Sequence, residues 1–374
     1  MGYSALEHFA PRWTAGHGAQ TWEIRRVVLA VVHSVAAAER VSAAVRAIES
    51  EPGIQVVFTQ PPGPAEELVR DYLAMIGALT TPWERAIRGR FDLVITADPG
   101  ETGSLNCALL VLPAVSGDGE IVGRNGRCCV AALARLLRQR PGRAGPVLVG
   151  LPHLQAMTRL RVTAPQVGRH AVVIGDPEYD KLLEACHEQA GIHRDQRLGL
   201  VLSALGPDSL LGRTPAVLRR LALELPSHRV RLVCRLDPDM WACHGRRQLL
   251  AWAGRVARER VEFLRPEHDW QAVAAAADFV VGDHGHDTAC AAGAQKPVYL
   301  ANPIRNAEVG SLREAVARYG TVLDPKVPLA FQFRWAPRRG TQVARRVTSA
   351  PGESFSLIRR QCFRLMQFTS PTVN

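Results

Sequence analysis

Residues 277–293 read ADFVVGDHGHDTACAAG, which predicts a strand, a tight polar loop and a helix of small residues. The apolar run ends at Gly282, Asp283 and His284 follow it, and Thr288 opens a helix rich in Ala and Gly. Free N–H groups at the start of a helix attract phosphate. The stretch therefore predicts either a diphosphate-binding loop of an α/β protein or an ordinary β-to-α turn whose polar residues cap the helix.

Similar apolar runs alternate with helical segments through the whole chain. They cover residues 27–32, 54–59, 91–96, 108–112 and 146–150 in the first half, 171–174 at the crossing between the halves, and 198–202, 230–234, 261–264, 279–282 and 297–300 in the second. Runs that are apolar throughout are typical of parallel strands covered on both faces. We therefore expect an α/β fold with two Rossmann-like, doubly wound domains facing a cleft. The domains are predicted at 1–170 and 171–330, and a basic helical tail at 331–374.

The composition limits the class of protein. The chain has 374 residues, 47% of them hydrophobic and 22% charged, which suits a folded protein of two domains. No segment reaches the roughly 18 consecutive apolar residues of a membrane-spanning helix, and residues 1–26 do not resemble a signal peptide. The eight cysteines are scattered without a Cys-x-x-Cys pair, which favours reduced thiols over a zinc site. We therefore expect a cytoplasmic protein.

The net charge of +11 comes mostly from arginine. It suits phosphate-rich ligands or an anionic surface, and it equally suits a genome that prefers arginine codons. No nucleic-acid-binding motif is present, so we expect no nucleic-acid partner.

Polar residues also follow strands of the first half. Glu101 comes after the third apolar run and Asp118 after the fourth, where α/β domains bind ligands, although turn chemistry explains both acids as well. His33, at the end of the first run, is expected to be a hydrogen-bonded structural histidine.

Several short motifs, in order along the chain, carry a resemblance to a known family. They are Val31–Ser34, Gly175–Leu182, Ser203–Gly212, Asp237–Trp241 with His244-Gly245, Gly282–Gly285 and Thr348–Ser354. This set resembles glycosyltransferases with two Rossmann domains (GT-B) and, more closely, actinobacterial relatives of the CDP-glycerol glycerophosphotransferases that polymerise teichoic acids.

The resemblance implies a transferase. A hydroxyl of a polyol, glycan or cell-envelope acceptor would attack an activated donor, CDP-glycerol or a nucleotide sugar such as a UDP-sugar, and the nucleotide would leave. His284 and the amides near Thr288 would hold the diphosphate, with His284 as a catalytic group on the donor side. The donor-binding residues implied are Asp208, Ser209, Asp237, Asp283, His284, Gly285, His286, Asp287 and Thr288. No cofactor and no metal ion are needed, because histidine and a helix terminus can do what Mg²⁺ does elsewhere.

The sequence departs from the family at three positions. The family's His-Gly pair, which would supply the acceptor-side base, is replaced by Ala114–Gly119; a usual His-Pro is Asp237-Pro238; and His286 stands where serine is common. Asp118 or Glu101 is the candidate to take over as the base. Two alternatives therefore stay open: a catalytically degenerate homologue that acts as a nucleotide-binding or scaffold subunit, and an enzyme similar to UDP-sugar 2-epimerases.

The tail is arginine-rich, and Phe355, Ile358, Cys362 and Leu365 recur at helical spacing. This pattern predicts a helix that packs back on the first domain. The alternative is peripheral contact with an anionic membrane at its inner face.

Overall fold

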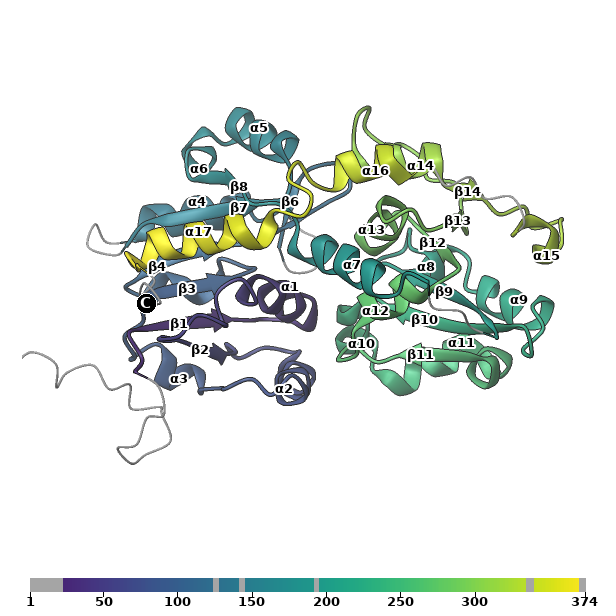
Figure 1. Cartoon of the computed structure of the whole chain (residues 1–374), viewed down its shortest axis with the longest axis horizontal. Coiled ribbons are helices and arrows are strands. Elements are labelled where there is room, and N and C mark those ends of the chain that lie inside the picture. The colour runs from purple at the N-terminus through teal and green to yellow at the C-terminus, as the bar shows by residue number, and fades with distance from the viewer. Residues whose placement is uncertain (1–22, 124–127, 141–144, 192–194, 334–339, 370–374) are drawn as a thin grey trace, which may run out of the picture.

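The computed structural model describes residues 23–123, 128–140, 145–191, 195–333 and 340–369. Two parallel six-stranded sheets lie side by side along the long axis of the molecule (Figure 1). The strand order is β2-β1-β3-β4-β7-β8 in the first sheet and β11-β10-β9-β12-β13-β14 in the second. The predicted α/β fold with two doubly wound domains is confirmed.

The first sheet contains β1 (Arg26–Val31), β2 (Ile54–Thr59), β3 (Leu93–Thr96), β4 (Ala108–Val111), β7 (Val147–Leu151) and β8 (Ala171–Val173). Its helices are α1 (Val35–Val45), α2 (Glu66–Met75), α3 (Trp83–Ala86), the 3-10 helix η1 (Gly100–Ser104), α4 (Val130–Gln139), α5 (Leu154–Thr163) and α6 (Pro165–Gly168). A small antiparallel hairpin, β5 (Ala114–Val115) with β6 (Ile121–Val122), follows β4.

The second sheet contains β9 (Arg197–Ser203), β10 (Val230–Leu236), β11 (Val261–Leu264), β12 (Phe279–Gly282), β13 (Val298–Leu300) and β14 (Thr321–Val322). Its helices are α7 (Pro177–Glu188), α8 (Leu210–Arg213), α9 (Ala216–Glu224), α10 (Pro238–His244), α11 (Arg246–Arg260), α12 (Trp270–Ala276), α13 (His286–Gly293), α14 (Leu312–Tyr319) and α15 (Leu329–Gln332). The described part of the tail forms α16 (Gly340–Val347) and α17 (Ser354–Met366), while residues 334–339 and 370–374 lie outside the described ranges.

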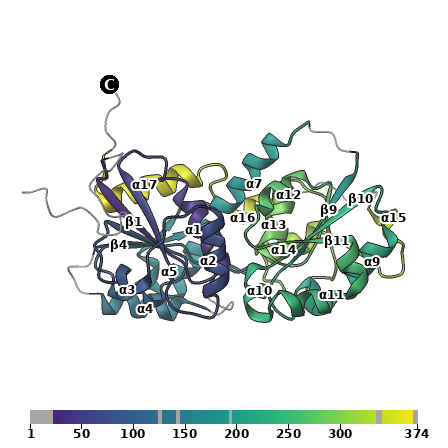
Figure 2. The same cartoon turned by 90° about the horizontal axis from the view of Figure 1, so that it is seen from below.

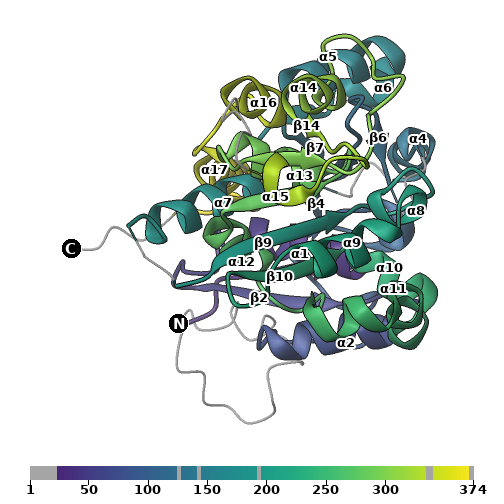
Figure 3. The same ribbon diagram turned by 90° about the vertical axis from the view of Figure 1, so that its right-hand side faces the viewer.

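Apolar residues cover both faces of each sheet, as the continuous apolar runs predict. In β1, Val28 and Ala30 belong to one buried cluster and Leu29 and Val31 to another on the opposite face. Figure 3 shows the corresponding layers of the second domain, with α14 and α16 on one side and α10 and α11 on the other. Because both faces are covered, a ligand can approach each sheet only at the ends of its strands.

The chain crosses between the sheets just after β8, whose residue Ala171 pairs with Val149 of β7. The first sheet thus extends to Val173. Gly175, at the crossing, has a φ of +77°, and a Cβ there would lie 2.9 Å from Cβ of Ser354. Glycine allows both the backbone conformation and the close passage of the tail.

The tail contacts both domains. Helix α16 packs on α13 and α14, and α17 then runs over the first sheet (Figures 1 and 2). The carboxylate of Asp180 fixes the start of α17 by accepting the N–H groups of Gly352 at 2.8 Å and Ser354 at 2.9 Å. Ile358 and Cys362 are fully buried in the first domain, so protein covers the apolar face of α17. Across the described ranges, none of the helices has the length and apolarity to traverse a bilayer.

Candidate functional site

A cleft of about 410 Å³ lies between the two domains, within the size range of small-ligand pockets. It is lined by residues that follow strands of both sheets, at the carboxyl ends where α/β domains bind ligands. From the first domain these include His33, Asp98, Pro113, Asp118 and Pro152, and from the second Ala204, Asp237, His284, Gly285 and His286. Five of the residues named from the sequence, namely Asp118, Asp237, His284, Gly285 and His286, therefore line one cleft.

The start of α13 offers backbone N–H donors to an anion in this cleft. Gly285 occupies the N-cap position and offers no side-chain cap. In the part of the chain that the structure describes, the N–H groups of His286, Asp287 and Thr288 have no hydrogen-bond acceptor. Three other helices at the cleft, α1, α7 and α14, begin with capping side chains. The unfilled donors and the helix dipole together can hold a phosphate.

Asp283 fixes the position of this helix start. Its carboxylate is 4% exposed and accepts the N–H groups of Ala204 at 2.9 Å, Leu210 at 2.7 Å and Gly285 at 2.9 Å. These bonds join the loop after β9 to the loop after β12. The side chain of Asp283 is therefore buried in the protein, whereas His284, the next residue, lines the cleft.

Asp287 belongs to a buried ion-pair group that connects the domains. Arg235 of β10, which is 4% exposed, donates from Nε to Asp287 at 2.7 Å and from its two terminal nitrogens to Glu39 of α1 at 3.2 and 2.8 Å. Its guanidinium also stacks over Trp270, 4.9 Å from the ring centre. Burial raises the pKa of Glu39 to about 7, although Arg235 opposes this shift. The group ties α1 of the first domain to the first turn of α13.

Sequence reasoning missed Arg235 and Glu39. The signal for Arg235 was a charged residue inside the apolar run VRLVCRL, because a buried cation requires a buried anionic partner. The sequence offered no sign that this partner would be Glu39, on the other domain.

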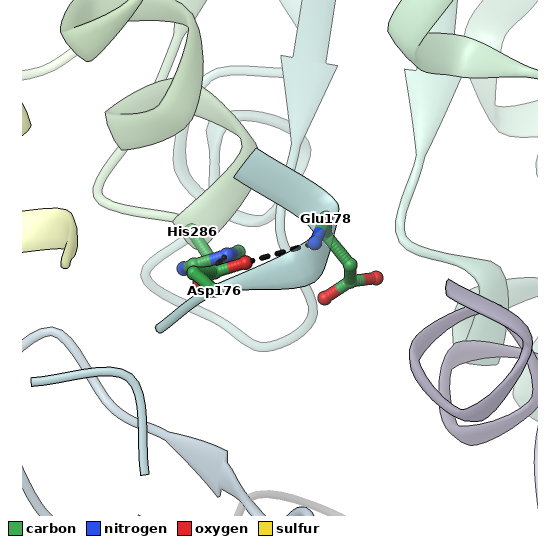
Figure 4. A group of neighbouring side chains, drawn as sticks. All are labelled: Asp176, Glu178 and His286. Carbon is green, nitrogen blue, oxygen red and sulfur yellow. Dashed lines mark hydrogen bonds and ion pairs between the residues drawn. The ribbon is translucent and has the colours of Figure 1, made fainter. Parts of the chain in front are cut away.

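His286 lies against Asp176, the residue that caps α7 at the domain crossing (Figure 4). Its Nε2 is 3.1 Å from Oδ2 of Asp176 and 3.3 Å from the sulfur of Cys290. Burial opposes the charged imidazole, but Cys290 and the Asp176 carboxylate together outweigh burial and hold the pKa of His286 well above its usual value. A positive charge therefore sits beside the start of α13.

Glu178 completes a group of three side chains, with Asp176 and His286, whose ligand atoms lie within 4.8 Å of one another and could hold a metal ion. Figure 4 shows the Glu178 carboxylate directed away from His286. Each of the three already has a protein partner. Oε2 of Glu178 lies 3.5 Å from Nε of Arg40, and Asp176 and His286 pair with each other.

Three other residues named from the sequence make local contacts in the second domain. Asp208 forms an exposed ion pair with Arg213 at 2.9 Å. Ser209 is buried and caps the short helix α8 by accepting the N–H of Gly212. Thr288 accepts the N–H of Asp283 at 3.3 Å, which tightens the loop. In this structure all three support the loops around the cleft.

Asp237 caps α10 by accepting the N–H of Asp239 at 2.9 Å, and burial followed by repulsion from Asp239 raises its pKa from 3.8 to about 7. The unfolded chain releases the proton of Asp237 at a lower pH than the folded protein does. The free energy of unfolding therefore falls as the pH rises from about 4 to 7.

We expect Asp237→Asn, which keeps a capping oxygen, to raise the free energy of unfolding at pH 8 by about 1–3 kcal/mol and to change it little at pH 4. Thermal unfolding at the two pH values measures this. The control is Asp269→Asn at the cap of α12, where Lys181 lies 2.8 Å away and the substitution should give no gain.

The two acids named in the first domain differ in position. Asp118, at the tip of the β5-β6 hairpin, lies at the cleft and contacts the second domain, with Oδ2 3.6 Å from Arg313 and Oδ1 accepting the N–H of Glu308 at 3.3 Å. Glu101 is half-exposed and is not among the residues that line the cleft. Glu101 is linked to the cleft through His33, a lining residue, because Nε2 of His33 lies 3.0 Å from the carboxylate of Glu101.

No protein-family model matches the chain, and no curated protein matches it. Solved structures do. The UDP-GlcNAc 2-epimerase of Neisseria meningitidis, bound to UDP-GlcNAc, superposes with a TM-score of 0.56 at 12% identity over 90% of this chain and 100% of that chain. A variant of the wall teichoic acid polymerase TagF gives 0.59 at 10% identity over 92% and 90%. HepE of Anabaena in complex with UDP-glucose gives 0.52 at 15% identity over 91% and 99%.

The chain has the fold of these proteins. The GT-B-like architecture expected from the sequence motifs is therefore confirmed, and the likeness spans both domains. At these identities the likeness concerns the fold, so donor, acceptor and reaction rest on the residues of the cleft.

Proposed function

We propose that this protein is a transferase that binds a nucleotide-activated donor in the cleft between its domains. The donor is CDP-glycerol or a nucleotide sugar, and the acceptor is a hydroxyl group of a polyol or glycan. The observation that carries the proposal is the uncapped start of α13 at a cleft of ligand size, with three N–H groups that no described residue accepts. Solved proteins of the same fold bind UDP-GlcNAc and UDP-glucose, which supports a nucleotide ligand.

The charges around α13 suit a diphosphate. Asp287 would repel an anion at this helix start, but Arg235 neutralises its carboxylate. His284 lies at the cleft beside these N–H groups, and His286, whose pKa Cys290 and Asp176 hold well above its usual value, pairs with Asp176 next to them. These donors can stabilise the negative charge that develops on the departing nucleotide.

We expect the donor nucleotide to raise the unfolding temperature. A nucleoside diphosphate at about 100 times its Kd should stabilise the protein by about 2.7 kcal/mol, which is roughly 3 °C for a chain of this size. CDP, UDP and their monophosphates, compared by thermal shift, identify the base and show whether the second phosphate contributes. No shift with any nucleoside diphosphate would overturn the proposal.

His284→Ala should weaken binding of that nucleotide about tenfold, because one hydrogen bond to a charged group is lost. The control is His187→Ala, on the exposed side of α7 and outside the cleft. Calorimetry of both variants measures the difference. Equal affinities would show that His284 does not contact the phosphates.

We propose that the reaction needs no metal ion, since histidine and the helix start supply the positive potential. Transfer should then proceed at an unchanged rate in excess EDTA. Inhibition by EDTA that a divalent cation reverses would contradict this and would point to Asp176, Glu178 and His286 as ligands.

The same assays separate the alternatives. A nucleotide-binding or scaffold subunit would bind the nucleotide without releasing it from any donor. A 2-epimerase would convert UDP-GlcNAc in the absence of an acceptor. Release of nucleotide that depends on an added polyol or glycan supports the transferase.

A further inference from the structure

The wall of the cleft on the first domain contains a histidine–carboxylate pair. His33 follows β1, and its side chain is 1% exposed. Its Nε2 lies 3.0 Å from Oε2 of Glu101, on η1. A carboxylate can only accept a hydrogen bond, so Nε2 carries the hydrogen and Nδ1 holds the lone pair. Glu101 thus selects the tautomer in which Nδ1 is basic.

Nδ1 of His33 is buried and has no hydrogen-bond partner among the described residues. Buried polar atoms are nearly always paired, so an orphan in a residue that lines a ligand-sized cleft requires an explanation. A substrate hydroxyl that donates to Nδ1 would satisfy it. The expectation of a purely structural histidine leaves this atom unexplained.

The acids near this wall are engaged elsewhere. Asp118 contacts Arg313 and the N–H of Glu308, and Oδ1 of Asp98 accepts the N–H of Gly100 at 2.9 Å. Residues 114–119, which replace the His-Gly pair of the similar family, contain no histidine. His33 is therefore the group on the first domain best suited to take a proton.

We propose that His33 is the catalytic base for the acceptor hydroxyl and that Glu101 is its positioning residue. The inference rests on the proposed transferase function. Nδ1 takes the hydroxyl proton while the acceptor oxygen bonds to the electrophilic atom of the donor. The bond from that atom to the departing phosphate oxygen breaks, and its electron pair leaves with the nucleotide. The proton then passes from His33 to solvent.

The test compares donor binding with turnover. The probe is CDP-glycerol or UDP-GlcNAc, whichever binds the wild-type protein in calorimetry, with glycerol as the hydroxyl acceptor and nucleotide release as the readout. His33→Gln retains an N–H for Glu101 and lacks the basic nitrogen. We expect it to lower the release rate at least 100-fold with an unchanged Kd for the donor. An unchanged release rate would overturn the assignment while leaving the transferase function standing.

Further variants exclude a structural explanation. His33→Ala should regain activity with added imidazole, whereas a role confined to folding would give no rescue. Glu101→Gln should lower the rate about tenfold and change the pH profile, and Glu101→Asp should restore part of it. If Asp98→Asn abolishes release while His33→Gln does not, the base is Asp98 and the proposal is wrong. Wild-type protein that binds no donor would instead contradict the proposed function itself.

Discussion

Arg235→Gln lowers the free energy of unfolding by about 3–5 kcal/mol, the effect expected when one partner of a buried ion-pair group is removed. Arg235 forms ion pairs with both Glu39 and Asp287, and the substitution leaves the nearly buried Glu39 and the partly exposed Asp287 without their cation. The Trp270 ring also loses its cation contact. Because Glu39 lies on the first domain and Asp287 on the second, the contact between domains should weaken as well.

The same strand provides a matched control. Arg231 pairs with Glu262 on β11, but its side chain is 59% exposed. Arg231→Gln should therefore change the free energy of unfolding by less than about 1 kcal/mol. Denaturant unfolding of the two variants measures the difference. Similar losses for both would contradict the view that Arg235 joins the domains through buried charge.

Asp283→Asn should destabilise the protein by about 2–4 kcal/mol and abolish detectable nucleotide binding. The carboxylate accepts three backbone N–H groups through two oxygens. Asparagine has one acceptor oxygen of the same reach, and its NH₂ group would face backbone donors. The loops after β9 and β12 would separate, and the start of α13 would lose its position.

Asp208→Asn is the control for this substitution, since its carboxylate is exposed and pairs with Arg213 at the surface. It should leave stability nearly unchanged. Thermal unfolding and calorimetry with the nucleotide found by thermal shift measure both effects. Full nucleotide binding by Asp283→Asn would show that the loop is not fixed by this residue.

Much of the fold could be predicted because its strands are buried on both faces. The apolar runs at residues 54–59 and 261–264 coincide with β2 and β11 at both ends. The strands that escaped prediction are β5, β6 and β14, which are two residues long and too short to carry a periodic signal. Their placement depends on neighbours that pair with them.

The site was predictable in part. The strand-loop-helix pattern placed residues 283–288 at the carboxyl end of a strand, and the structure puts His284, Gly285 and His286 at the cleft. The pattern did not distinguish Asp283, which faces inward, from His284, because a tight loop has no periodicity that fixes side-chain direction. The roles of these residues in binding stay predictions.

The sequence by itself determined the two α/β halves and the polar loop after β12, because burial of a parallel sheet and the turn that ends a strand are local properties of the chain. Only the tertiary structure decided which side chains meet. Glu39 and Arg235 are 196 positions apart, and His33 and Glu101 are 68 apart. Their pairing follows from strand order and from the contact between domains. Local patterns do not record such contacts, since even a charge placed inside an apolar run does not say which distant residue will pair with it.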